Sequence, residues 1–106
     1  MPEHEEIAQT VEHLQRAFED LAVRGLRSAG PDQLARLTAL GAELERIGAS
    51  HLAGRVAAVV EGVRNHDRAA AAALLRAQAS LRVFERILTL QVVGETLAVL
   101  TETEEE

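Results

Sequence analysis

The hydrophobic positions of the first thirty residues recur at intervals of three or four. They are Ile7, Val11, Leu14, Phe18, Leu21 and Gly25. Spacings of 4, 3, 4, 3 and 4 are those of one face of an α-helix, and they predict a helix over residues 3–28. Acidic residues at positions 3, 5 and 6 and arginines at 24 and 27 suit the dipole of this helix. In the segment SAGPD that follows, Gly30 is expected to end the first helix and Pro31 to begin the next.

Two shorter helices are predicted in the middle of the chain. Leucines at 34, 37, 40 and 44, followed by Ile47, indicate a second helix that ends near Gly48. Ser50 is a candidate N-cap for a third helix. Alternatively, the two segments form one kinked helix. The expected inward positions of the third helix are Leu52, Val56, Val59 and Val63.

A fourth helix is predicted after the sequence RNHD, in which Asn65 or Asp67 is expected to act as the cap. It opens with five alanines at positions 69–73, a run with high helix propensity that also allows a neighbouring helix to approach closely. The expected core positions that follow are Leu74, Ala77, Leu81, Phe84 and Leu88.

Residues 88–101 are compatible with two structures. Their β-branched residues and the Gly94–Glu95 pair are typical of a two-residue hairpin. A helix is favoured because a single hairpin has no sheet to join and is marginally stable. As a helix, this segment would extend beyond its neighbours and expose apolar side chains that need a partner, most simply a second copy of the chain. The predicted association surface consists of Ile87, Leu90, Val93, Leu97 and Leu100.

These patterns predict an all-α fold, an antiparallel helical bundle of three to four helices with a long C-terminal helix. Residues 1–106 are expected to form a single domain that ends in an acidic tail at 101–106. The composition agrees with a helical core, since the chain has two phenylalanines, no tryptophan and no tyrosine. It also has no cysteine, which excludes disulfides, thiol nucleophiles and thiolate metal sites.

The charge distribution argues against nucleic acid as a partner. The net charge is −6, with −5 in residues 1–20, +3 in residues 21–100 and −4 in residues 101–106. Phosphate contacts supply most of the affinity for nucleic acids, and an acidic protein is poorly suited to them. No apolar run reaches transmembrane length, and the first residues are acidic where a signal peptide is basic. A cytoplasmic protein without a membrane partner is expected. The arginine-only basic residues and the many alanines suggest a bacterial source.

The four histidines form no pattern that predicts chemistry. A di-iron bundle uses a Glu three residues before each His. Here the residues three positions before His13, His51 and His66 are Thr10, Gly48 and Val63. His51 is interpreted as a structural or surface residue in the first turn of the third helix. No catalytic, cofactor-binding or metal site is predicted, and the protein is not expected to be an enzyme. An enzyme or a ligand-binding bundle with its site in a cavity between the alanine-rich helices is the remaining alternative.

Residues 37–81 resemble the second half of histidine-phosphotransfer domains, which are four-helix bundles of bacterial phosphorelays. The resemblance lies in IGA at 47–49, HLAGRVAAVVEGV at 51–63 and NHDRAAAAALL at 65–75. It implies a helical bundle. The position of the phosphorylated histidine corresponds to Thr38 and that of the following lysine to Gly41, so the phosphotransfer motif itself is missing.

Two functions follow from these observations. The first is a small non-enzymatic helical protein that acts by protein–protein association, an adaptor or accessory subunit that is expected to be homodimeric. The alternative is a degenerate phosphotransfer-like module that docks a response-regulator receiver domain through a face around Thr38, Gly41 and Glu45.

Overall fold

The computed structural model describes the backbone of residues 4–105 and the side chains of residues 4–102. Within this range the chain forms four α-helices and no strand. They are α1 (His4–Arg24), α2 (Pro31–Arg46), α3 (Ser50–Arg64) and α4 (Ala70–Glu105), and a 3₁₀-helix, η1 (Leu26–Ser28), connects α1 to α2. The prediction of an all-α fold with a long last helix is confirmed. Glu3, placed in the first predicted helix, and Glu106, in the acidic tail, lie outside the described residues.

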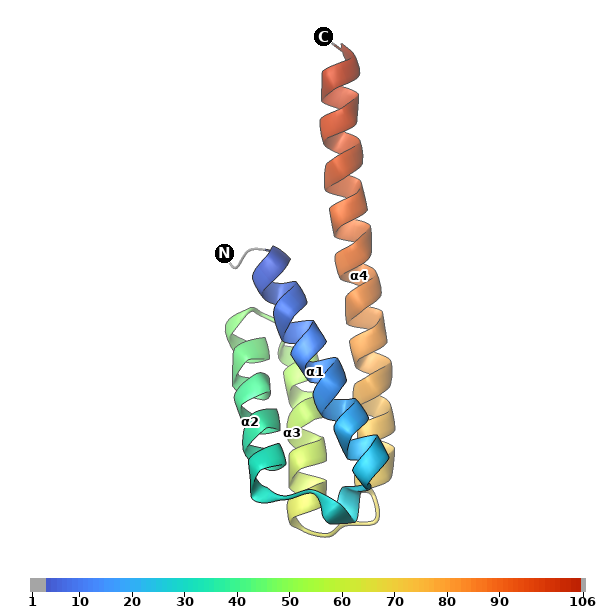
Figure 1. Cartoon of the computed structure of the whole chain (residues 1–106). Helices are drawn as coiled ribbons and strands as arrows, with labels where there is room; N and C mark the ends of the chain where they lie inside the picture. Colours follow the sequence, from blue (N-terminus) through green and yellow to red (C-terminus); the bar gives the residue numbers. More distant parts are fainter. Residues whose placement is uncertain (1–3, 106) are drawn as a thin grey trace.

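The last helix is much longer than the two that precede it. Figure 1 shows the chain reversing direction at each connection, so that α1, α2, α3 and the first half of α4 lie side by side. We call α1–α3 together with residues 70–88 the helical body. Helix α4 has 36 residues, which at 1.5 Å per residue makes it about 54 Å long. The whole molecule is 61 Å long and 21 Å wide. The second half of α4 therefore extends beyond the helical body (Figure 1).

The core of the helical body is built almost entirely from aliphatic side chains. The stripe predicted for α1 is buried from Val11 to Leu21, and Ile7 is half-buried. All four inward positions predicted for α3 are buried. One side of the alanine run packs in the core, where Ala70 is buried, whereas Ala71 and Ala72 are exposed. The largest fully buried side chains are Leu14, Phe18, Leu21, Leu37, Leu44, Val56 and Val59.

The first helix ends earlier than predicted, at Arg24. Gly25 has a φ of +87°, in the left-handed region that favours glycine, and its N–H donates to the carbonyl oxygen of Leu21 at 2.8 Å. Gly25 therefore ends the helix instead of continuing its apolar stripe. The predictions that the helix reaches residue 28 and that Gly30 ends it are wrong, because this turn closes α1 and residues 26–28 form η1.

Helix α2 begins at the predicted proline. Gly30 occupies its N-cap position, and Pro31 is the first helical residue. The amide oxygen of Gln33 accepts a hydrogen bond from the Gly30 N–H at 3.1 Å. The Nε2 atom of Gln33 donates a hydrogen bond to the carboxylate of Asp20 at 2.5 Å. Gln33 thus both caps α2 and connects its start to α1.

Gly48 separates α2 from α3, so the alternative of one kinked helix is wrong. Its φ is +89°, its N–H donates to the Glu45 carbonyl at 3.1 Å, and the Ala49 N–H donates to the Leu44 carbonyl at 2.8 Å. This pair of bonds is a Schellman motif. The carbonyl of Ala49 accepts the first hydrogen bond of α3, so Ala49 is the N-cap and Ser50 the first helical residue. The prediction of Ser50 as N-cap is wrong because the motif places the cap one residue earlier.

A second Schellman motif joins α3 to α4, with a histidine in the left-handed position. His66 has a φ of +51° and donates its N–H to the Val63 carbonyl at 3.2 Å. The Asp67 N–H donates to the Gly62 carbonyl at 2.9 Å. Of the two capping residues predicted here, Asp67 accepts a hydrogen bond from the N–H of Ala69 at 2.9 Å through Oδ1. His66 therefore has a conformational role in this turn.

Residues 88–101 are helical, and the hairpin alternative is wrong. The helix satisfies its own backbone hydrogen bonds, whereas a hairpin would present two unpaired edges. The hydroxyls of Thr89, Thr96 and Thr101 each donate to the carbonyl four residues earlier, at 2.9 Å. These bonds satisfy the threonine hydroxyls within α4 itself.

Arg46, at the end of α2, forms ion pairs with Glu6 of α1 and with Glu43 one turn earlier. Its Nη2 lies 2.5 Å from Oε1 of Glu43. The hydrogen bond from Arg46 lowers the pKa of Glu43 from its ordinary value of 4.5, and the pKa of Arg46 is raised in turn. The two helices are thereby linked by a surface charge cluster at one end of the helical body.

Candidate association surface

The predicted association residues lie together on the outer side of α4. We call Ile87, Leu90, Val93, Leu97 and Leu100 the association face. At about 100° per residue, they fall within an arc of about 140° on the helix. Ala77, Leu81 and Leu88, which pack against the helical body, lie on the opposite side of α4. Most of the association face therefore points away from the other helices, whereas Val93 borders the groove between α1 and α4.

All five side chains of the association face are exposed, with between 48% and 65% of their surface accessible. No side chain from residue 89 to residue 102 is buried. Single exposed leucines are ordinary on protein surfaces, but a contiguous patch of large aliphatic side chains marks an interaction site. Helix α4 thus has two apolar sides, of which the inner one is covered by the helical body only as far as Leu88.

The outer apolar side continues towards the start of α4. Val83 lies on it one heptad before Leu90, and Leu75 lies near its beginning with 64% of its surface exposed. Leu75 was not predicted as an exposed residue, because the alanine run and the neighbouring Leu74 define only the buried side of the helix. The signal that identifies it is its spacing of eight residues from Val83. Arg82 and Arg86 are exposed on the same segment.

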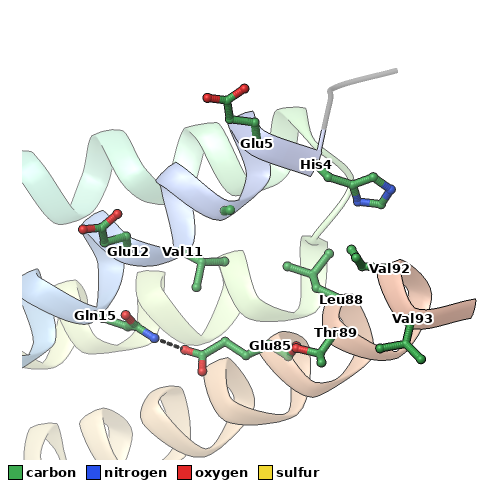
Figure 2. A pocket seen from close by; sticks show the side chains of 11 residues that line it. His4, Glu5, Val11, Glu12, Gln15, Glu85, Leu88, Thr89, Val92 and Val93 are labelled. Carbon is green, nitrogen blue, oxygen red and sulfur yellow. Dashed lines mark hydrogen bonds between the residues drawn. The ribbon is translucent and has the colours of Figure 1, made fainter. Parts of the chain in front are cut away.

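A groove of about 710 Å³ runs between the start of α1 and the middle of α4 (Figure 2). Val11, Leu88, Val92 and Val93 are the large apolar side chains of its lining, so Val93 of the association face also borders this groove. Gln15 donates a hydrogen bond to Glu85 across the groove, shown as the dashed line in Figure 2. The groove is open to solvent along the side of α4 that faces α1.

The N-terminus of α1 contacts α4 at the edge of this groove, which His4 helps to line. Nε2 of His4 lies 3.1 Å from the carboxylate of Glu95, and both side chains are exposed. This pair leaves no signal in the sequence, because its members are 91 positions apart and no local pattern connects them. The contact places the start of α1 against the part of α4 that extends beyond the helical body.

The remaining histidines lie apart. His13 is exposed on α1, His51 is exposed in the first turn of α3, and His66 occupies the turn before α4. Among the described side chains, no group of three or more His, Cys, Asp or Glu is arranged to hold a metal ion. Thr10 is a buried polar side chain, and its hydroxyl donates to the carbonyl of Glu6 at 3.2 Å within its own helix. That the chain has no catalytic or cofactor site stays a prediction.

The three residues of the predicted receiver-docking face also lie together. Thr38, Gly41 and Glu45 line a shallow groove of about 430 Å³ between α2 and α3. The hydroxyl of Thr38 donates to the carbonyl of Leu34 at 2.8 Å. This groove is therefore a second candidate docking surface, separate from α4.

In the described part of the chain, no helix combines the length and the apolar character that crossing a membrane requires. No family model matches the sequence, and comparisons with curated proteins and with solved structures found no match. The class of protein is therefore defined by its fold alone: an all-α protein with a long, partly unsupported last helix.

Proposed function

We propose that the protein is a non-enzymatic association module, an adaptor or accessory subunit, whose helices form an antiparallel bundle and whose association face pairs with a second copy. The observation that supports this function is the exposure of five large aliphatic side chains on one side of a helix that extends past its own core. Self-association is the simplest way to cover such a surface, because identical copies present the same patch to each other.

The interior of the helical body supports a role in association over one in catalysis. Its buried side chains are aliphatic apart from Phe18 and Thr10, and the hydroxyl of Thr10 is bonded within its own helix. Catalytic sites generally require titratable groups held together by burial and neighbouring charges. The net charge of −6 supports a protein partner over nucleic acid.

The test is the solution mass of the full chain, measured by sedimentation across a wide range of concentrations. The expected species is a reversible dimer. Replacing Leu90 and Leu97 together by Glu should convert it to a monomer, because two charges per copy would be buried at the interface. Val23→Glu is the matched control, since Val23 has 86% of its surface exposed but lies on α1. This variant should remain dimeric, and circular dichroism should show equal helicity in all three proteins.

Two results would contradict the proposal. One is a wild-type chain that stays monomeric at the highest concentration reached. The other is a folded Leu90→Glu/Leu97→Glu variant that dimerises as tightly as the wild type, which would move the association to a different surface.

A second candidate function is supported by the groove between α2 and α3. A degenerate phosphotransfer-like module would dock a receiver domain there, and Thr38, Gly41 and Glu45 share that groove. The test is titration with receiver domains from the same genome. Binding that Gly41→Arg abolishes and Leu97→Glu leaves unchanged would favour this function, whereas failure of every receiver to bind would remove it.

A further inference from the structure

We infer that the two copies pair through α4 in an antiparallel orientation, crossing near Val93 and Gly94. This inference rests on the proposed function, since it concerns the geometry of the same association face. Three independent properties of α4 support it: the order of its apolar residues, the distribution of its charges and its position relative to the helical body.

The apolar residues of the association face are arranged almost symmetrically about positions 93 and 94. When two helices are laid antiparallel with these positions at the crossing, Ile87 of one copy is level with Leu100 of the other. Leu90 is then level with Leu97. Large aliphatic side chains therefore meet large aliphatic side chains on both sides of the crossing. Gly94 lies at the centre, where the absence of a side chain allows the two backbones to approach closely.

The charges of α4 and its flanks are separated along its length. Residues 68–86 contain four arginines and one glutamate, whereas residues 87–106 contain five glutamates and no basic residue. In an antiparallel pair, Arg82 and Arg86 of one copy lie level with positions 105 and 101 of the other, next to its acidic end. In a parallel pair each acidic end would lie beside its counterpart, and like charges would repel. Antiparallel pairing also opposes the two helix dipoles.

The position of α4 makes this arrangement accessible. By its helical positions, most of the association face lies on the side of α4 opposite the buried residues Ala77 and Leu81. The helical body lies at one end of α4 (Figure 1). Antiparallel pairing about position 93–94 overlaps residues 82–105 of each copy, a length of about 36 Å. The two helical bodies then lie at opposite ends of the pair. Leu75 falls outside the overlap, although it lies on the same side of the helix.

Cross-linking distinguishes the two orientations, and the absence of native cysteine makes every introduced thiol unique. We would prepare Ile87→Cys and Leu100→Cys in full-length chains with tags of different size. Each is treated with a short bismaleimide, alone and after mixing. In the antiparallel pair the mixed sample should form a cross-linked heterodimer, whereas each variant alone should not, because its two thiols are about 20 Å apart along the axis.

The opposite pattern, with efficient cross-linking of each variant alone and little in the mixture, would overturn the antiparallel orientation. The mass of the untreated variants separates this failure from that of the proposed function. A dimer with the parallel pattern overturns only the orientation, and a monomeric wild type overturns both.

Two measurements without cysteine check the same geometry. In the antiparallel pair, Leu75→Glu should leave the dimer dissociation constant unchanged, whereas Leu90→Glu should raise it. In a parallel pair both leucines lie within the overlap, so both substitutions should raise the dissociation constant. Added salt should weaken the wild-type antiparallel dimer by several-fold, because it screens attraction between opposite charges. Tightening with salt would indicate the repulsion expected of parallel pairing.

Discussion

Two leucines on the same helix provide the sharpest test of how α4 is used. Leu81 is 4% exposed and packs in the core, whereas Leu97 is 58% exposed on the association face. Replacing each by alanine removes the same atoms, and alanine favours helix at both positions. Leu81→Ala should therefore lower the free energy of unfolding of the monomer by about 2–5 kcal/mol through the cavity it leaves. Leu97→Ala should lower monomer stability much less, by about 1 kcal/mol at about 0.8 kcal/mol per buried methylene, because more than half of the leucine side chain is already exposed there.

The effect of Leu97→Ala should appear in dimerisation. Removing three carbon atoms from a fully buried site costs about 2.4 kcal/mol at about 0.8 kcal/mol per methylene. Since 58% of the side chain is exposed in the monomer, roughly 1.4 kcal/mol per copy depends on association. The symmetric dimer contains the change twice, so its dissociation constant should rise by roughly 100-fold.

The assays are urea denaturation at concentrations well below the dimer dissociation constant, and sedimentation equilibrium for the dimer itself. The reasoning is refuted if Leu97→Ala destabilises the isolated monomer as much as Leu81→Ala does. An unchanged dissociation constant for Leu97→Ala would equally contradict it, since the association face would then remain exposed in the dimer.

Three further predictions concern the helical body. His66→Gly should raise the free energy of unfolding by about 1 kcal/mol, because glycine adopts the left-handed conformation at this turn without strain; no change in the urea midpoint would argue against strain there. Gly54→Ala should stabilise α3 by up to about 1 kcal/mol, since a Cβ at Gly54 meets nothing within 4 Å. A Cβ at Gly62, in contrast, would lie 3.1 Å from Ala70 at the start of α4. Gly62→Ala should therefore gain less than Gly54→Ala or lose stability in the same denaturation assay, and an equal gain would show that the start of α4 moves freely. The lowered pKa of Glu43 means that its contribution to stability is present above the ordinary value of 4.5 and falls as the pH decreases through the lowered value. Glu43→Gln should consequently lose less stability on acidification than the wild type, and parallel pH profiles for the two proteins would contradict this role for the ion pair with Arg46.

The placement of the association-face residues on one side of α4 was predictable because this helix has a regular repeat. The positions of Ile87, Leu90 and Leu97 on one helix face follow from their spacing, which is independent of the rest of the chain. Leu75 was missed because its neighbour Leu74 belongs to the core, and spacing alone does not show which of two adjacent leucines is covered. The contact between His4 and Glu95 was missed because it joins opposite parts of the chain.

The helix ends were less predictable than the helices. Glycines at 25, 30 and 48 all mark connections, but their roles depend on the conformation each adopts. Gly25 and Gly48 take positive φ values and end helices, whereas Gly30 is extended and begins one. A periodic sequence can continue through either kind of glycine, so the pattern placed the end of α1 too late.

The sequence by itself determined that the chain is helical up to about residue 88, roughly where those helices occur and which side of each is apolar, since these depend on local propensity and on the repeat of hydrophobic residues. Beyond residue 88 it favoured a helix but left a hairpin as the alternative. Only the tertiary structure decided which apolar side is covered. Helix α4 has aliphatic residues on two sides, and its inner side is buried only along the length of the shorter helices beside it. Val92, on the inner side, is exposed because of that difference in length, whereas the association face is exposed because no other described helix packs on its side of α4. Both are relations between distant segments that no local pattern contains.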